Sequence, residues 1–338
     1  MKKILLSGLG VLLAVLTVSS SAFALTVSPT KIELKGDPGQ VVSGDFELLN
    51  EQKNPITLYP SYENFEASGE DGTPNFVAGD YDLAVWMKAQ DSVTLKAGEY
   101  QKIPFTITIP KDADAGGHYA AVFWGTNPPA ASGETSVSIG AKTGILILLT
   151  VSGDVKEGGS LLEFSAKENQ RFFTSLPIDF YYRFQNGGGD RLKPTGTVKI
   201  KNTFWLTADE FDANKTNGNV LPNSTRRFVT TWDGIDKDDL KEDVVLKDEN
   251  LGGKKGFFDT VSYQWNHFAM GMYTAKLGLT YGSDAKIAGD SFIFFVLPWQ
   301  LMIVMALIIL VVFFVLRFGI RKYNKWVINN ALASRRRK

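Results

Sequence analysis

The sequence predicts an all-β protein in which two antiparallel β-sandwiches of immunoglobulin-like type precede a single transmembrane helix. Two observations carry this prediction. Short segments with alternating apolar and polar residues recur between Gly-, Pro- and Asn-rich turns along residues 25–296. One uncharged apolar run, residues 297–316, follows them. The chain has no cysteine, so the disulfide of antibody domains is excluded and only the architecture is predicted.

The clearest strand is at residues 103–109, where four isoleucine or phenylalanine side chains alternate with Pro and Thr. Residues 145–151 are apolar without alternation, which predicts a central strand covered on both faces. Other strands are expected at 25–34, 42–49, 56–62, 93–95 and 118–124. A polar loop is expected between the strand 56–62 and about residue 80, followed by a short helix at 81–88. Together they make a first sandwich over residues 25–152.

Three glycines between residues 152 and 160 mark a change in composition, which we take as the domain boundary. The second sandwich is expected over residues 155–296. Its predicted strands are 161–166, 178–184, 195–202, 220–232, 273–281 and 291–296. The charged segment 231–256 is expected to form an exposed hairpin or insertion. Because the last strand leads directly into the apolar run, the second domain should lie close to the bilayer.

The two ends of the chain predict a topology. Residues 1–24 resemble a secretory signal peptide, with Lys2 and Lys3, an apolar stretch and the small-residue cleavage pattern Ala22-Phe23-Ala24. A helix over residues 297–316 would be about 30 Å long at about 1.5 Å per residue, which matches the hydrocarbon thickness of a bilayer. The sandwiches are therefore expected outside the cell membrane. A buried core helix is the alternative interpretation of the apolar run.

The residues that flank the apolar run support this orientation. Trp299 suits a membrane interface, where amphipathic aromatic rings are enriched. Residues 317–338 contain eight basic and no acidic residues, so the positive-inside rule places this tail in the cytoplasm. Arg317, Arg321 and Lys322 are the basic residues expected at the inner interface. Aromatic residues interleave with the basic ones, so the tail is either an amphipathic helix on the inner leaflet or a plain stop-transfer segment.

The net charge of zero hides an acidic exported part. The leader contributes two basic residues and the tail eight, which leaves 26 basic against 36 acidic residues in between, a net charge of −10. This charge argues against nucleic acid as a partner and against electrostatic docking on anionic membranes or wall polymers. The absence of cysteine excludes thiol catalysis and cysteine-ligated metals.

Five segments carry a resemblance to a known family. In the first domain these are SPTKIELKGDPGQVVSGDFELLNEQKNPITLYPSYENF and IPFTITIPKDADAGGHYAAVFW; in the second they are LKPTGTVKIKN, NVLPNSTRRFVTTW and MGMYTAKLGLTYG. These segments resemble the WxL-interacting protein family of Gram-positive surfaces. The order of leader, two immunoglobulin-like domains, helix and basic tail is also similar. The resemblance implies that the first domain binds peptidoglycan and that the second binds another surface protein or a host component.

No motif for catalysis is present, and no cofactor or metal is predicted. His118 and His267 are isolated in sequence and are more simply explained by packing. The acidic clusters 209–214 and 236–239 do not match a calcium-binding loop and are interpreted as solvated loops. We therefore predict a non-enzymatic adhesion or scaffold protein. The alternative is an envelope enzyme, or an enzyme subunit, acting on glycans, which would need two carboxyl groups about 5–10 Å apart across a groove.

Aromatic side chains are the remaining candidates for binding, because sugar rings stack on aromatic faces and aromatics anchor protein interfaces. The candidates are Tyr119, Phe123 and Trp124 in the first domain and Trp205 and Trp232 beside loops of the second. The alternative is that they are core residues. The expected partner is a cell-wall glycan or another surface protein.

Overall fold

The computed structural model describes residues 25–77, 79–128, 142–234 and 256–335. The expected signal peptide, the acidic cluster 236–239 and most of the segment 231–256 lie outside these residues. The chain divides into two compact units. Unit 1 contains residues 1–68, 73–157 and 188–191, and unit 2 contains residues 69–72, 158–187 and 192–338.

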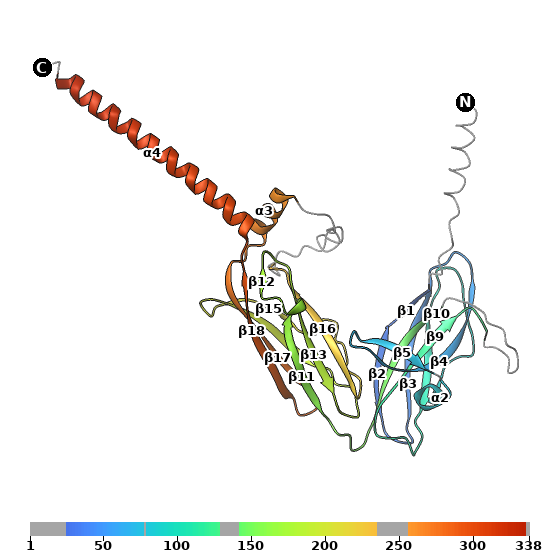
Figure 1. Cartoon of the computed structure of the whole chain (residues 1–338). Coiled ribbons are helices and arrows are strands. Elements are labelled where there is room, and N and C mark those ends of the chain that lie inside the picture. The colour runs from blue at the N-terminus through green and yellow to red at the C-terminus, as the bar shows by residue number, and fades with distance from the viewer. Residues whose placement is uncertain (1–24, 78, 129–141, 235–255, 336–338) are drawn as a thin grey trace, which may run out of the picture. The chain divides into compact units, whose positions relative to one another are not determined.

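Unit 1 is a sandwich of two sheets (Figure 1). One sheet has the order β1-β3-β8-β6, formed by β1 (Leu25–Ser28), β3 (Val41–Asn50), β8 (Tyr100–Thr108) and β6 (Met87–Lys88). The other has the order β2-β10-β9-β4-β5, formed by β2 (Lys31–Gly36), β10 (Lys142–Val151), β9 (Gly116–Gly125), β4 (Ile56–Ser68) and β5 (Thr73–Val77), with β7 (Val93–Leu95) paired to β4. The β2–β10 pair is parallel, and the other pairs of this unit are antiparallel.

The core of unit 1 follows the alternation in the sequence. Ile103, Phe105 and Ile107 of β8 are buried, while the residues between them are exposed. Phe46 of β3 packs against Trp124 of β9 with ring centroids 5.9 Å apart, which joins the two sheets. The prediction of a central strand is confirmed, since β10 lies between β2 and β9.

Unit 2 is a second immunoglobulin-like sandwich (Figure 1). Its smaller sheet has the order β11-β13-β16, formed by β11 (Gly159–Ala166), β13 (Ile178–Asn186) and β16 (Ser224–Trp232). Its larger sheet has the order β12-β18-β17-β14-β15, formed by β12 (Phe172–Phe173), β18 (Lys286–Val296), β17 (Gly271–Tyr281), β14 (Thr195–Asn202) and β15 (Thr207–Asp212). A 3₁₀ turn, η1 (Lys167–Asn169), follows β11. Phe180, Phe184 and Phe294 are fully buried between the sheets.

Some local predictions are wrong. The expected polar loop after residue 62 is instead the second half of β4 and the hairpin to β5. The acidic residues 209–212 form strand β15 rather than a solvated loop, because Phe211 is buried and anchors the strand in the core. Helix α3 (Phe257–Asn266) was not predicted. The short helix expected at 81–88 is present as α2 (Asp82–Trp86).

The apolar run forms the beginning of helix α4 (Trp299–Arg335), which has 37 residues. The span Trp299–Asn329 contains an 18-residue window of mean hydropathy 3.1, of which 6% is buried. By length and composition this is one candidate membrane span among the described residues. A soluble core helix is mostly buried, so the exposure of α4 argues against that alternative. The helix continues through most of the basic tail, which the sequence left open.

Candidate functional site

Two of the five predicted aromatic residues belong to the cores. Trp124 lies between the sheets of unit 1, and Trp232 packs edge-on against Tyr273 and Phe294 in unit 2. Both side chains are buried, so their faces are not available to a ligand. For these residues the structure supports the alternative that the sequence left open: they are core residues because inward-facing positions of a strand bury large rings.

Phe123 lies at the edge of a small aromatic cluster and is also largely buried. Its ring meets Phe76 edge-on at 4.9 Å between centroids, and the Lys142 ammonium lies 4.2 Å from its centroid. Phe76 in turn contacts Phe65. These neighbours cover Phe123, so it is not a free stacking surface. Trp205 differs from the other four candidates because its side chain is 73% exposed, in the turn between β14 and β15.

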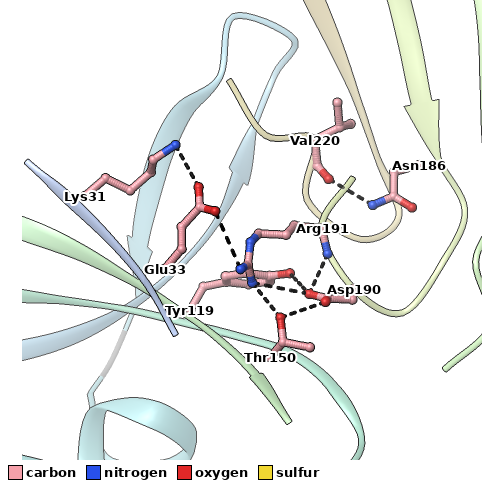
Figure 2. A network of polar contacts seen from close by, with 8 residues as sticks. All are labelled: Lys31, Glu33, Tyr119, Thr150, Asn186, Asp190, Arg191 and Val220. Carbon is pink, nitrogen blue, oxygen red and sulfur yellow. Dashed lines mark hydrogen bonds and ion pairs between the residues drawn. The ribbon is translucent and has the colours of Figure 1, made fainter. Parts of the chain in front are cut away.

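Tyr119 is part of a polar network in unit 1 (Figure 2). Its hydroxyl donates to Asp190 Oδ1 at 3.2 Å, and Thr150 Oγ1 donates to Asp190 Oδ2 at 2.8 Å. The Arg191 guanidinium donates to Thr150 Oγ1 at 2.7 Å and lies 3.8 Å from Glu33 Oε2. Burial raises the pKa of Tyr119 well above its usual range, and the negative charge of Asp190 adds to the effect.

The charged side chains of the network are mostly covered by the protein, with Asp190 23% and Glu33 28% exposed. The Arg191 side chain is 10% exposed, and its charge is compensated by Glu33 and Asp190. Buried charges that are paired and hydrogen-bonded stabilise one arrangement of the chain rather than attract a ligand. We therefore interpret the network as the attachment of segment 188–191 to unit 1. Sequence reasoning missed it because Asp190 and Arg191 lie in a glycine-rich turn that is distant in sequence from β9 and β10.

A groove of about 660 Å³ runs along the outer face of the β11–β13–β16 sheet in unit 2. Outward-facing residues of all three strands line it, among them Glu163, Tyr181, Arg183 and Arg227. Glu163 Oε1 accepts hydrogen bonds from Ser165 at 3.1 Å and from Tyr181 at 3.2 Å, and Glu163 Oε2 lies 3.8 Å from Arg183 Nη1. The groove thus offers both charge signs and a phenol ring to a polar ligand.

Three of the carboxylates that line this groove have partners within the protein. Arg183 Nε donates to Glu70 Oε2 at 2.8 Å, and Arg183 Nη2 donates to Glu70 Oε1 at 2.5 Å. Glu163 accepts from two hydroxyls, and Asp179 Oδ1 accepts from Thr231 Oγ1 at 2.8 Å. A glycosidase would instead need one carboxyl group kept protonated and aimed at a leaving group. Within the described residues there is no group of three or more His, Asp or Glu side chains that could hold a metal ion.

His118 is placed in β9 and faces α2. Its Nδ1 lies 2.5 Å from Asp82 Oδ1, its Nε2 lies 2.9 Å from the Asp114 carbonyl, and its ring packs on Trp86 at 4.7 Å between centroids. Burial acts to lower the pKa of His118, but the contacts with Asp82 and Asp114 outweigh it and raise that pKa. The contacts with Asp82 and Trp86 tie α2 to the sheet.

The predicted interface residues all lie on α4. Trp299 begins the helix and is 45% exposed, and its ring contacts Phe257 of α3 at 6.4 Å between centroids. Arg317, Arg321 and Lys322 follow the apolar window and are exposed. An exposed apolar helix of this length, with an aromatic ring at one end and cations at the other, matches the pattern of a membrane span.

No protein-family model matches the chain, and no curated protein matches its sequence. Among solved structures, the class 5 fimbriae chaperone CfaA aligns with 80% of this chain and 99% of its own, at 13% identity and a TM-score of 0.36. The SafB chaperone, solved with Salmonella enterica SafA pilin, aligns with 82% of this chain at 9% identity and a TM-score of 0.34, and 99% of the matched chain is covered. The E. coli chaperone DraB aligns with 61% of this chain and 86% of its own, at 10% identity and a TM-score of 0.31. At these sequence identities and TM-scores, the likeness carries no argument about a site residue or a ligand of this chain.

Proposed function

We propose that this chain is a non-enzymatic surface protein, anchored in a bacterial cell membrane by α4, whose two sandwiches lie outside and bind a cell-wall glycan or another surface protein. The observation that carries the proposal is the exposed apolar window of α4 with its basic tail. Such a helix is stable in water only when it is covered, and a bilayer covers it along its whole length.

The groove of unit 2 is our candidate ligand site. A peptidoglycan fragment carries hydroxyl, amide, amino and carboxylate groups, which match the mixed charges of Lys167, Arg227 and Glu163 and the ring of Tyr181. The resemblance to the WxL-interacting family supports a wall or surface partner, although it assigns peptidoglycan to the first domain. The acidic charge of the exported part requires that binding rest on directed contacts rather than on general attraction.

The proposed ligand is tested by co-sedimentation of the full chain, in mild detergent, with purified peptidoglycan sacculi across a salt series. Binding that persists at high salt is expected, and Arg227→Glu should weaken it. Lys276→Glu is the matched control, since it makes the same charge change at an exposed position of the other sheet. Absence of binding at any salt would remove the wall role and leave a protein partner. Equal loss in both variants would place the site elsewhere.

The proposed topology is tested by cysteine labelling, because the chain has no cysteine of its own. Asp284→Cys lies in the β17–β18 turn and should react with a membrane-impermeant maleimide in intact cells. Lys325→Cys lies after the apolar window and should react only after the cells are permeabilised. Labelling of Lys325→Cys in intact cells would contradict the proposed orientation.

A further inference from the structure

Six large apolar side chains at one end of unit 2 remain open to solvent. Three follow one another in the β14–β15 turn, and three belong to α3 and the loop after it. They are Phe204, Trp205, Leu206, Phe258, Trp265 and Phe268, with exposed fractions between 63% and 80%. We call these six residues the apolar lip. A soluble domain rarely exposes so many large apolar groups together, so the lip indicates an interaction surface.

Strand register places the lip at the end of the sheet where the membrane helix begins. Asn202, the last residue of β14, pairs with Tyr273 near the start of β17, and Gly271 pairs with Val296 at the end of β18. Helix α4 begins three residues later, at Trp299. Two strand spacings of about 4.8 Å separate β14 from β18, so the turn after Asn202 lies about 10 Å to the side of this junction.

Helix α3 is attached at the same level. The side chain of Gln264 is buried; its Nε2 donates to Gln300 Oε1 at 2.7 Å, and its Oε1 accepts from Leu301 N at 3.0 Å. Both partners lie in the first turn of α4. Phe258 and Trp265 are seven residues apart and therefore lie on one stripe of α3, away from Gln264. Both segments of the lip thus lie at the end of unit 2 at which the apolar helix starts.

Hydrogen bonds fix the backbone of the β14–β15 turn. Asn202 Oδ1 accepts from Phe204 N at 3.0 Å and from Leu206 N at 3.1 Å, and Thr203 Oγ1 donates to the Met272 carbonyl at 3.0 Å. Trp205 has φ = 62°, a conformation that favours glycine and is uncommon for a bulky residue. A tryptophan that occupies this position despite its backbone cost points to a use for the ring.

The chemistry of the lip matches a bilayer interface. The turn 203–206 has no charged residue, and α3 has one, Asp259. Tryptophan and phenylalanine are favoured at the level of the lipid headgroups, where a ring can meet both acyl chains and water. The general acidity of the exported part does not oppose this contact, since it needs no electrostatic attraction.

We propose that the apolar lip inserts into the outer leaflet of the membrane that α4 crosses, so that unit 2 rests on the lipid surface. The inference rests on the proposed membrane anchor and adds a second contact to it. The hydrogen bonds of Gln264 to Gln300 and Leu301 fix the start of α4 to unit 2. A single helix can still tilt and rotate in a bilayer, and unit 2 would then move with it. Insertion at two further points, the β14–β15 turn and α3, defines a plane and holds the unit in one orientation to the bilayer.

The test uses the full chain reconstituted in vesicles of phosphatidylcholine and phosphatidylglycerol. Four single-cysteine variants carry the same environment-sensitive fluorophore: Trp205→Cys and Phe258→Cys in the lip, Leu310→Cys within α4, and Asp284→Cys in the β17–β18 turn. Asp284 is the distal control, because β17 has 11 residues and at about 3.3 Å per residue separates the two ends of the sheet by about 35 Å. Quenching at positions 205, 258 and 284 is then measured with a lipid that carries a nitroxide near its headgroup. Quenching at position 310, which lies about 16 Å along the helix from Trp299, is measured with a lipid that carries the nitroxide deep in its acyl chain.

We expect loss of most of the emission at positions 205 and 258 and no loss at position 284. Equal quenching at 205, 258 and 284 would overturn the lip, while quenching at Leu310→Cys would still support the anchor. Absence of quenching at Leu310→Cys would instead overturn the anchor and with it the lip. Shielding of positions 205 and 258 from water without lipid quenching would assign the surface to a protein contact and likewise overturn the proposal.

A second variant tests the contribution of the turn without a fluorophore in it. Trp205→Gly relieves the left-handed backbone of the turn and therefore does not threaten the fold. Combined with Phe204→Ser and Leu206→Ser, it should reduce lipid quenching of the probe at position 258. Gly278→Ala, on the same sheet but at an open position outside the lip, serves as the control and should leave the quenching unchanged. Unchanged quenching in the triple variant would contradict a joint insertion of the two segments.

Discussion

At the scale of single residues, two tyrosine hydroxyls of unit 2 show how burial and hydrogen bonding differ in their energetic effect. Tyr182 is fully buried and its hydroxyl has no hydrogen-bond partner among the described residues. Burial raises its pKa well above the usual range, while the nearby charge of Arg226 acts in the other direction. Tyr281, in contrast, donates its hydroxyl to the Gly159 carbonyl at 2.8 Å.

The pair gives a direct prediction. Tyr182→Phe should leave the stability of unit 2 unchanged or raise it by about 1 kcal/mol, because it removes a polar group that was desolvated without compensation. Tyr281→Phe should lower the stability by about 1 kcal/mol, because it removes a hydrogen bond. Urea unfolding of both variants measures the difference. The reverse order would show that the Tyr182 hydroxyl has a partner, such as an ordered water.

The contact of His118 with Asp82 makes the stability of unit 1 depend on pH. The pKa of His118 is raised in the folded protein: burial opposes the shift, and the contacts with Asp82 and Asp114 produce it. The stabilisation is therefore fully present below the unfolded value of about 6.5 and is lost as the pH rises through the folded pKa. Thermal unfolding of unit 1 should shift to lower temperature over that range.

His118→Gln should abolish this part of the pH dependence while the other groups continue to titrate. The chain contains two histidines, so NMR of the imidazole C–H groups can follow both, and the substitution assigns the signal of His118. A midpoint for His118 at or below 6.5 would contradict the raised pKa and the role of Asp82.

At the scale of elements, the β14–β17 pair depends on one glycine. Gly196 of β14 pairs with Leu279, and a side chain at position 196 would collide with the Gly278 carbonyl. A side chain at Gly278 itself, on the neighbouring strand, would meet nothing within 4 Å. The two glycines therefore have different roles, although both lie in strands where glycine is usually unfavourable.

Gly196→Ala should destabilise unit 2 by roughly 2–3 kcal/mol, since the backbone of two strands must move apart. Gly278→Ala is the matched control and should be neutral or stabilising by up to about 1 kcal/mol, because it restricts the unfolded chain. Urea unfolding compares the two. A similar effect of both substitutions would mean that strand propensity, rather than the close approach at position 196, determines the outcome.

At the scale of the whole molecule, the anchor and the sandwiches are separable in the sequence. A chain that ends after Val296 lacks α4 and should be released from the membrane fraction of cells. A chain that ends after Leu316 keeps the apolar window but lacks the basic tail. It should remain in the membrane fraction with the sandwiches outside, because the expected signal peptide exports them before α4 enters the membrane. Fractionation followed by protease protection measures both results. Retention of the shorter chain in the membrane would show that α4 is not the main attachment.

The sequence by itself determined the all-β class, most strand positions and the apolar helix. Alternation of apolar and polar residues and a long uncharged run are local patterns, and each directly reflects which side chains avoid water. The tertiary structure decided which aromatic residues are accessible. Trp124 and Trp232 are core residues and Trp205 is exposed, yet all three lie in or beside strands, and only the packing of the sheets distinguishes them. It also decided that Phe204, Trp205 and Leu206 share one end of unit 2 with α3 and the start of α4. Strand pairing brings together segments that are far apart in sequence, and neither the apolar lip nor the network around Asp190 could be predicted without that pairing.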